Sequence, residues 1–147
     1  MNISTILITI FILIMDVVLI SIDRKNKLIF VGKNIYRIVM PAMIAAFIIT
    51  TLISKNFKVE DIMILVLVLP LAFLGNKRGI TEKGLLINSY VTPWDKIESY
   101  SLEERKKTYI LHYKSNVGTK KIFFKLEDKD EVKKYLLGIK KLRYSKK

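Results

Sequence analysis

The pattern of hydrophobic and polar residues divides the chain into an apolar first half and an alternating second half. Long apolar stretches cover residues 3–22, 35–53 and 62–75. A helix of about 20 apolar residues crosses roughly 30 Å of hydrocarbon at about 1.5 Å per residue. The pattern therefore predicts a membrane region over residues 1–76 with three helices, at about residues 3–22, 35–53 and 60–75.

The third stretch is shorter than the other two, and proline interrupts the second and the third at Pro41 and Pro70. Proline removes a backbone donor and kinks a helix, although such kinks are common in membrane helices. The third stretch therefore has three interpretations: a full crossing, a re-entrant segment, or a crossing that thins the bilayer locally.

From residue 79 onward the period changes from helix to strand. Residues 79–84 predict a short strand and a tight turn, in which Gly84 supplies the positive φ. Two further strands are predicted over residues 85–90 and 94–101, separated by Pro93, because proline cannot donate to a ladder. Alternation over residues 108–114 and 119–126 predicts a hairpin around a turn at 115–118.

The chain then enters a helix. Asp128 and Glu131 have the spacing of a capping box, and apolar residues follow on one helical face: Val132, Tyr135, Leu136, Ile139 and Leu142. The fold class predicted for residues 77–147 is therefore an α+β domain, with a small antiparallel sheet capped by one C-terminal helix. Its predicted core comprises Trp94, Ile97, Tyr100, Leu111, Phe124 and Leu136.

Charge sets the expected orientation. The formal net charge is +13 although the mean hydropathy is +0.30, and past Leu74 there are 19 Lys and Arg against 9 Asp and Glu. Since basic loops stay in the cytoplasm, the alternation of basic-poor and basic-rich loops predicts an outside N-terminus and a cytoplasmic domain. The first stretch lacks a preceding cation and a small-residue cleavage site, which favours a retained helix over a cleaved signal.

Asp16 is the one ionisable residue deep inside a predicted helix. A carboxylate within a membrane usually faces a partner or water. Arg37 begins the second helix near the same side, so an Asp16–Arg37 ion pair is one interpretation. The alternative is a carboxylate near the membrane boundary that water reaches.

The basic residues of the second half are the other candidate for binding. Cations gain about 1 kcal/mol each near an anionic leaflet, which predicts a membrane-surface patch of Lys77, Arg78, Lys133, Lys134, Lys140 and Lys141. The alternative is a charge that only solvates the domain and follows the positive-inside bias. No base-reading motif accompanies these cations, so nucleic acid is not an expected partner.

The sequence offers little for catalysis. Cysteine is absent, and the one histidine, His112, lies on an alternating strand where a surface position is expected. No cluster of His, Asp and Glu has the spacing of metal ligands, and no glycine-rich phosphate loop is found. The sequence therefore predicts a non-catalytic protein without a metal or another cofactor.

Three features carry a resemblance to a known family: Gly79-Ile80-Thr81-Glu82-Lys83-Gly84-Leu85, then Trp94-Asp95-Lys96-Ile97, then the hairpin and its capped helix. Together they resemble the small pleckstrin-homology-like domains of bacterial membrane proteins. The resemblance covers about the last half of the chain and implies a binding or scaffolding module rather than an enzyme. Some similar proteins are encoded beside leaderless bacteriocins and protect the producing cell.

Two functions are therefore expected from the sequence. The first is a multi-pass protein of the bacterial cell membrane that presents a basic binding module to the inner leaflet, with anionic lipid or a membrane protein as its partner. The alternative is self-immunity against a membrane-active bacteriocin peptide, in which the helices and Asp16 would meet the peptide.

Overall fold

The computed structural model describes residues 3–54 and 58–145, and the chain divides into two compact units. The helical unit comprises residues 1–25 and 35–76, and the β-rich unit comprises residues 26–34 and 77–147. The break after residue 76 coincides with the predicted boundary, but residues 26–34, predicted within the membrane region, belong to the β-rich unit. The loop contains a short apolar run, residues 28–31, but four residues are too few for periodicity to predict a strand.

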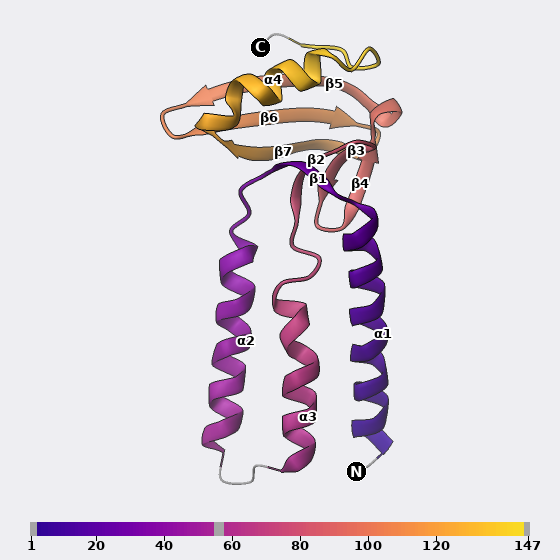
Figure 1. Ribbon diagram of the computed structural model, residues 1–147, viewed down its shortest axis with the longest axis vertical. Helices are drawn as coiled ribbons and strands as arrows, with labels where there is room; N and C mark the ends of the chain where they lie inside the picture. Colours follow the sequence, from indigo (N-terminus) through magenta and orange to yellow (C-terminus); the bar gives the residue numbers. More distant parts are fainter. Residues whose placement is uncertain (1–2, 55–57, 146–147) are drawn as a thin grey trace. The chain divides into compact units, whose positions relative to one another are not determined.

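The helical unit contains α1 (Ile3–Lys25), α2 (Tyr36–Ile53), α3 (Val59–Val68) and the 3-10 turn η1 (Leu69–Ala72). Figure 1 shows its three α-helices side by side. Two of them, α1 and α2, are long and apolar enough to cross a membrane. Pro41 lies inside α2 without ending it.

The third predicted helix is shorter than expected. Instead of running over residues 60–75, the α-helix ends at Val68 and continues as the four-residue turn η1, which has Pro70 near its start. Proline cannot donate the next backbone hydrogen bond and its ring crowds the preceding turn, which accounts for the change of helix type at this point.

One sheet of the β-rich unit contains β1 (Leu28–Val31), β2 (Arg78–Thr81), β3 (Gly84–Ile87) and β4 (Tyr90–Pro93), antiparallel and in this order. Glycine is required in β2, because a Cβ atom on Gly79 would lie 2.0 Å from the carbonyl oxygen of Phe30 in β1. The strand predicted over residues 85–90 ends at Ile87, since Asn88 and Ser89 have φ values of 48° and 69°. Two consecutive positive φ values form the tight hairpin turn that joins β3 to β4.

The second sheet contains β5 (Ile97–Arg105), β6 (Thr108–Ser115) and β7 (Gly118–Lys125), also antiparallel, with β6 in the centre. A β-bulge interrupts the β5–β6 register between Ile97 and Ser99. The predicted start of this strand is wrong, because Trp94 belongs to the 3-10 turn η2 (Trp94–Lys96). A bulge increases the local twist and changes the direction of the strand.

The helix α4 (Lys129–Leu137) follows the 3-10 turn η3 (Leu126–Asp128). Asp128 is the N-cap residue, but the predicted capping box is not formed: the Asp128 side chain makes no cap hydrogen bond. The reason is that η3 already holds Asp128 in a helical conformation, with φ −83° and ψ 0°, whereas a capping residue is usually extended. Ile139 and Leu142 come after the helix but still pack against the core.

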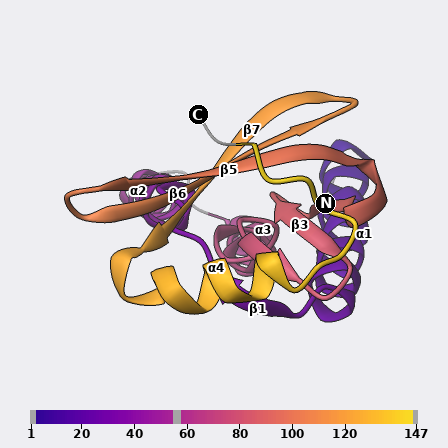
Figure 2. The same ribbon diagram turned by 90° about the horizontal axis from the view of Figure 1, so that it is seen from above.

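The hydrophobic core of the β-rich unit is formed by both sheets together with α4. Of the six residues predicted for it, five are buried, namely Ile97, Tyr100, Leu111, Phe124 and Leu136, and Trp94 is partly buried. The Trp94 Nε1 donates a hydrogen bond of 2.8 Å to the carbonyl of Glu82. Seen from above in Figure 2, α4 lies beside β1, and the rings of Phe30 and Tyr135 make an edge-to-face contact at 5.7 Å.

Candidate functional site

The predicted Asp16–Arg37 pair is not formed. Asp16 is buried, together with Ile12 one turn earlier on α1, and its Oδ1 atom has no hydrogen-bond partner among the described residues. Within the same part of the chain, no ion pair joins Asp16 to Arg37. The charge pattern identified an unusual carboxylate, but it did not identify its surroundings, which depend on how α1 packs against its neighbours.

The six residues predicted for the basic patch fall into two groups. Lys77 and Arg78 are partly buried at the start of β2, where Arg78 Nε donates a hydrogen bond of 3.3 Å to Asn88 Oδ1. The other four are exposed on α4 and on the segment after it: Lys133, Lys134, Lys140 and Lys141. The structure therefore places four of the six predicted residues on an exposed basic surface at α4 and just after it, and the other two at the start of β2.

His112 occupies a position that the sequence did not predict. Its side chain is 7% exposed, although a surface position was expected. The expectation was wrong because β6 is the central strand, and five consecutive residues of it, Tyr109 to Tyr113, are buried on both faces. A polar side chain in such a place needs a hydrogen-bond partner.

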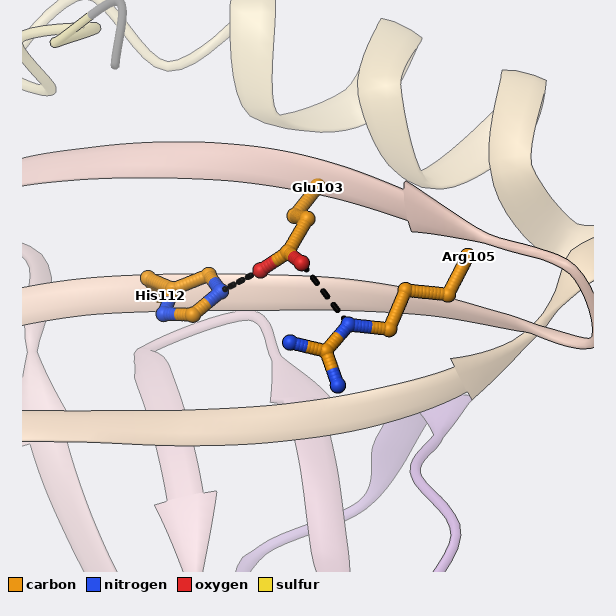
Figure 3. Close-up of polar contacts among 3 residues, drawn as sticks. All are labelled: Glu103, Arg105 and His112. Atoms are coloured by element: carbon orange, nitrogen blue, oxygen red, sulfur yellow. Dashed lines mark hydrogen bonds and ion pairs between the residues drawn. The ribbon is translucent and has the colours of Figure 1, made fainter.

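Glu103 is that partner, and it is itself held by a third side chain. His112 Nε2 lies 2.7 Å from Glu103 Oε2, and Arg105 Nε donates a 2.7 Å hydrogen bond to Glu103 Oε1 (Figure 3). In the β5–β6 register Glu103 is opposite Ile110, and His112 is opposite Ser101. His112 and Glu103 are thus diagonal neighbours on one sheet face, and we call Glu103, Arg105 and His112 the clamp.

The clamp keeps Glu103 ionised. Hydrogen bonds from Arg105, and then from His112, lower the pKa of Glu103 below its ordinary value. A carboxylate can only accept hydrogen bonds, so the imidazole nitrogen beside it, Nε2, must carry a proton. The tautomer and orientation of the ring are therefore fixed by its neighbour, as in many sites where histidine has a function.

A small open pocket lies next to the clamp. It measures about 160 Å³ and is lined by the polar residues Ser99, Ser101, His112, Lys114, Thr119 and Ser145, together with parts of two neighbouring tyrosines. The β-bulge that follows Ile97 lies at this pocket, and Lys114 Nζ pairs there with Glu98 Oε2 at 2.9 Å. The backbone N–H of Ser145 donates to the Tyr100 carbonyl at 2.7 Å, which fixes the C-terminal segment along the edge of β5.

A second hollow lies along α4. It measures about 470 Å³ and is mostly apolar, with Phe30, Tyr135 and Ile139 in its lining and Glu131 and Lys134 at its sides. Its size is within the range of ordinary small-molecule sites, about 300–1,000 Å³. It has few polar groups that could orient a ligand, whereas the pocket at the clamp has several.

The chemistry available at the clamp is that of binding and of holding a proton. The hydrogen-bond donors that line the adjacent pocket are the imidazole of His112, the ammonium group of Lys114 and several hydroxyls. In the part of the chain that the structure describes, no group of three or more His, Cys, Asp and Glu residues could hold a metal ion.

A sequence signal for the clamp did exist, in the alternation of Glu103 and Arg105 before the two-residue turn at Lys106 and Lys107. Pairing Arg105 with Thr108 across this turn places Glu103 opposite Ile110 and therefore diagonal to His112. The signal was missed because the predicted strand ended at residue 101, which left Glu103 and Arg105 outside it, whereas β5 extends to Arg105. The pocket itself depends on the bulge and on the C-terminal segment, which the pattern does not predict.

Comparison with known proteins gives one match. Residues 76–141 match the model of a family described as a domain of unknown function, DUF5673. The matched stretch begins just before β2 and ends after α4, so it contains the clamp but not β1. No curated protein and no solved structure matches the chain. The C-terminal part of the chain is therefore similar to DUF5673 domains.

Proposed function

We propose that this chain is a non-catalytic membrane-anchored binding protein, in which apolar helices hold a basic β-rich module at the inner face of a bacterial cell membrane. The exposure of α1 and α2 carries this proposal. Of the most apolar window in each helix, 11% is buried in α1 and none in α2. The core helix of a soluble protein would be mostly buried, so these exposed apolar surfaces favour a lipid environment.

Polar side chains within the helices are compatible with lipid. The hydroxyls of Thr9, Thr50 and Thr51 donate hydrogen bonds of 2.8, 2.8 and 2.9 Å to backbone carbonyls of the preceding turn. Satisfied in this way, a threonine adds no unpaired polar group to an apolar helix.

The pairing of β1 with β2 supports a chain that crosses the membrane more than once. β1 precedes α2 in the chain and β2 follows α3, and the two strands form one antiparallel ladder. Both must therefore lie on the same side of a membrane. If α2 crosses the bilayer, the chain from residue 54 to residue 77 has to bring it back, and α3 with η1 is the helical segment available for this.

The return segment is short for this role. At about 1.5 Å per residue for α3 and about 2.0 Å for η1, the two elements extend for roughly 23 Å. This is less than the roughly 30 Å of a typical hydrocarbon core. Local thinning of the bilayer around α3 accommodates the difference at a modest cost. The basic β-rich unit is then on the cytoplasmic side, as the positive-inside rule requires, and the N-terminus is outside.

Cysteine accessibility tests this topology, because the natural chain has no cysteine. Lys58→Cys lies just before α3 and Asn116→Cys lies in the exposed β6–β7 turn. In intact cells, a membrane-impermeant maleimide is expected to label the first variant but not the second. Permeabilised cells, in which both variants should react, provide the control. Labelling of Asn116→Cys in intact cells would contradict the proposed orientation.

The basic surface of α4 is proposed to meet the anionic leaflet. In nanodiscs that contain the full chain, Lys133, Lys134, Lys140 and Lys141 are expected to react more slowly with an amine reagent when the lipid is anionic. High salt should restore their reactivity, because the screening length falls from about 10 Å at 0.1 M salt to about 3 Å at 1 M. Lys83, exposed in the β2–β3 turn, is the matched control. Equal reactivity of the four lysines in neutral and anionic discs would refute docking.

The burial of Asp16 weakens the alternative function in self-immunity. A cationic peptide would need an accessible acidic contact inside the membrane, but Asp16 is buried in the helical unit. We therefore propose binding at the membrane surface as the function that the described residues support best.

A further inference from the structure

The size of the pocket at the clamp limits it to a small group. Its volume of about 160 Å³ is below the range of about 300–1,000 Å³ that is usual for drug-sized ligands. The hydroxyls of Ser99, Ser101 and Thr119 line it, and none of them has a hydrogen-bond partner among the described residues. Ser99 and Ser101 are two residues apart on β5 and lie opposite Lys114 and His112, so both hydroxyls can donate to one acceptor beside the His112 ring. Thr119 lies on β7, on the far side of Lys114.

The imidazole of His112 adds a fourth group with a fixed orientation. Its Nε2 is engaged by Glu103, and Figure 3 shows the other ring nitrogen, Nδ1, on the side away from that carboxylate. The pocket lies on the same side as Nδ1. From His112 it extends along the strands to the cross-strand pair of Ser99 and Lys114. Glu103, which is opposite Ile110, lies in the other direction along the strands. Nδ1 is therefore the ring nitrogen available to a ligand.

Protonation decides what Nδ1 offers. Because Nε2 must carry a proton beside the Glu103 carboxylate, Nδ1 is an acceptor in the neutral ring and a donor in the imidazolium. The charged groups around the pocket are Glu98, Glu103 and Arg105 from β5, Lys114 on β6, which pairs with Glu98 at 2.9 Å, and Lys121 on β7, the cross-strand partner of His112. The three cations outnumber the two carboxylates, so the charge around the pocket favours an anion.

We propose that this pocket binds a tetrahedral oxyanion, namely a phosphate group, which accepts hydrogen bonds from His112 Nδ1–H and from the hydroxyls of Ser99 and Ser101. Lys114 lies at the pocket, where its ammonium group pairs with Glu98. Glu103 and Arg105 are positioning residues, since they hold the ring without touching the ligand. This proposal goes beyond the membrane-anchored function and does not depend on it.

Nuclear magnetic resonance of the single histidine tests the proposal in the full chain. With ¹⁵N-labelled histidine in a nonionic detergent, only the His112 ring contributes side-chain signals. Sodium sulfate is the first probe, at constant ionic strength, because its charge does not change across the neutral range. A saturable change in the ring signals is expected, with an affinity that falls as the pH rises. The absence of saturable binding at any pH would overturn the proposal.

Substitutions then separate the role of Nδ1 from the fold. His112→Gln keeps an amide donor toward Glu103 but removes Nδ1, and sulfate binding measured by calorimetry should weaken by at least about tenfold. Glu103→Gln should weaken binding and change the His112 ring signals of the free protein, because the ring then loses the carboxylate that fixes its orientation. Lys83→Gln, in the exposed β2–β3 turn, is the control and should bind like the natural chain.

The fluorescence of Trp94, the one tryptophan, verifies that each variant is folded. Wild-type sulfate affinity in folded His112→Gln would exclude Nδ1 as a ligand contact and overturn the proposal.

Two further experiments distinguish a soluble phosphomonoester from a lipid headgroup as the source of the phosphate group. Glycerol phosphate is added to the protein in nanodiscs of phosphatidylcholine, and phosphatidic acid is incorporated in the discs without a soluble ligand. A ring-signal change in the first arm alone identifies a soluble phosphomonoester, and a change in the second alone identifies a lipid headgroup. No change in either arm would refute a phosphate site.

Discussion

His112 shows how one buried residue depends on its immediate neighbours. An imidazole on the central strand loses contact with water, and this loss is costly unless its nitrogens are hydrogen-bonded. Glu103 replaces the lost water at 2.7 Å, and Arg105 holds the other oxygen of Glu103 at the same distance. The three side chains therefore depend on one another, since removing Glu103 leaves both His112 and Arg105 without this hydrogen bond.

The acid stability of the β-rich unit should reveal the clamp. Since hydrogen bonds from Arg105 and His112 lower the pKa of Glu103 from 4.5, the folded state binds this proton more weakly than the unfolded state. Stability from Glu103 is therefore present above the unfolded pKa and is lost as the pH falls through the lower folded pKa.

Urea unfolding followed by Trp94 fluorescence measures this effect. The stability advantage of the natural chain over Glu103→Gln should shrink as the pH falls below about 4.5. An advantage that stays constant from neutral to acid pH would show that the Glu103 charge does not stabilise the fold.

At the scale of elements, the sequence predicted what depends on local periodicity. The two long apolar helices, the β6–β7 hairpin and the helix after Asp128 all follow from spacing, and so does the burial of Leu111, Phe124 and Leu136. What it missed depends on contacts between distant segments. β1 pairs with β2, which follows it in the chain only after α2 and α3. The His112 pocket depends on the bulge in β5 and on the C-terminal segment.

The helix α4 allows a matched test of core packing. Leu136 is 1% exposed, whereas Leu137, the next residue, is 61% exposed. Leu136→Ala should lower the free energy of unfolding by about 2–5 kcal/mol, because it leaves a cavity between α4 and the sheets.

Leu137→Ala removes the same atoms from the surface and should change the free energy by less than about 0.5 kcal/mol. Denaturant titrations of both variants provide the measurement. Similar losses in the two variants would mean that α4 does not pack on the sheets by its Leu136 face.

At the scale of the whole molecule, the β-rich unit is discontinuous in sequence. Residues 26–34 belong to it, although residues 35–76, which belong to the helical unit, separate them from its remainder. β1 covers the edge of β2, and Phe30 contacts Tyr135 on α4. A fragment that begins at residue 77 therefore lacks part of its own sheet.

Two soluble fragments test this dependence. Residues 77–147 alone are expected to be less stable than the same residues preceded by 26–34 and a glycine-rich linker. A difference of at least about 2 kcal/mol is expected in urea, because an uncovered strand edge and exposed apolar surface replace β1. Phe30→Ala in the joined fragment should lie between the two. Equal stability of the two fragments would mean that β1 adds nothing to the unit.

The place of β1 in the chain has a consequence for biosynthesis. A ribosome releases this strand early, but its partner β2 follows only after α2, α3 and η1 have been made. Closure of the sheet is thus a late event, and in the proposed topology it requires that the intervening helices were inserted in the correct orientation. In that topology, a wrongly inserted chain has β1 and β2 on opposite faces of the bilayer, with open strand edges that cellular proteases can recognise.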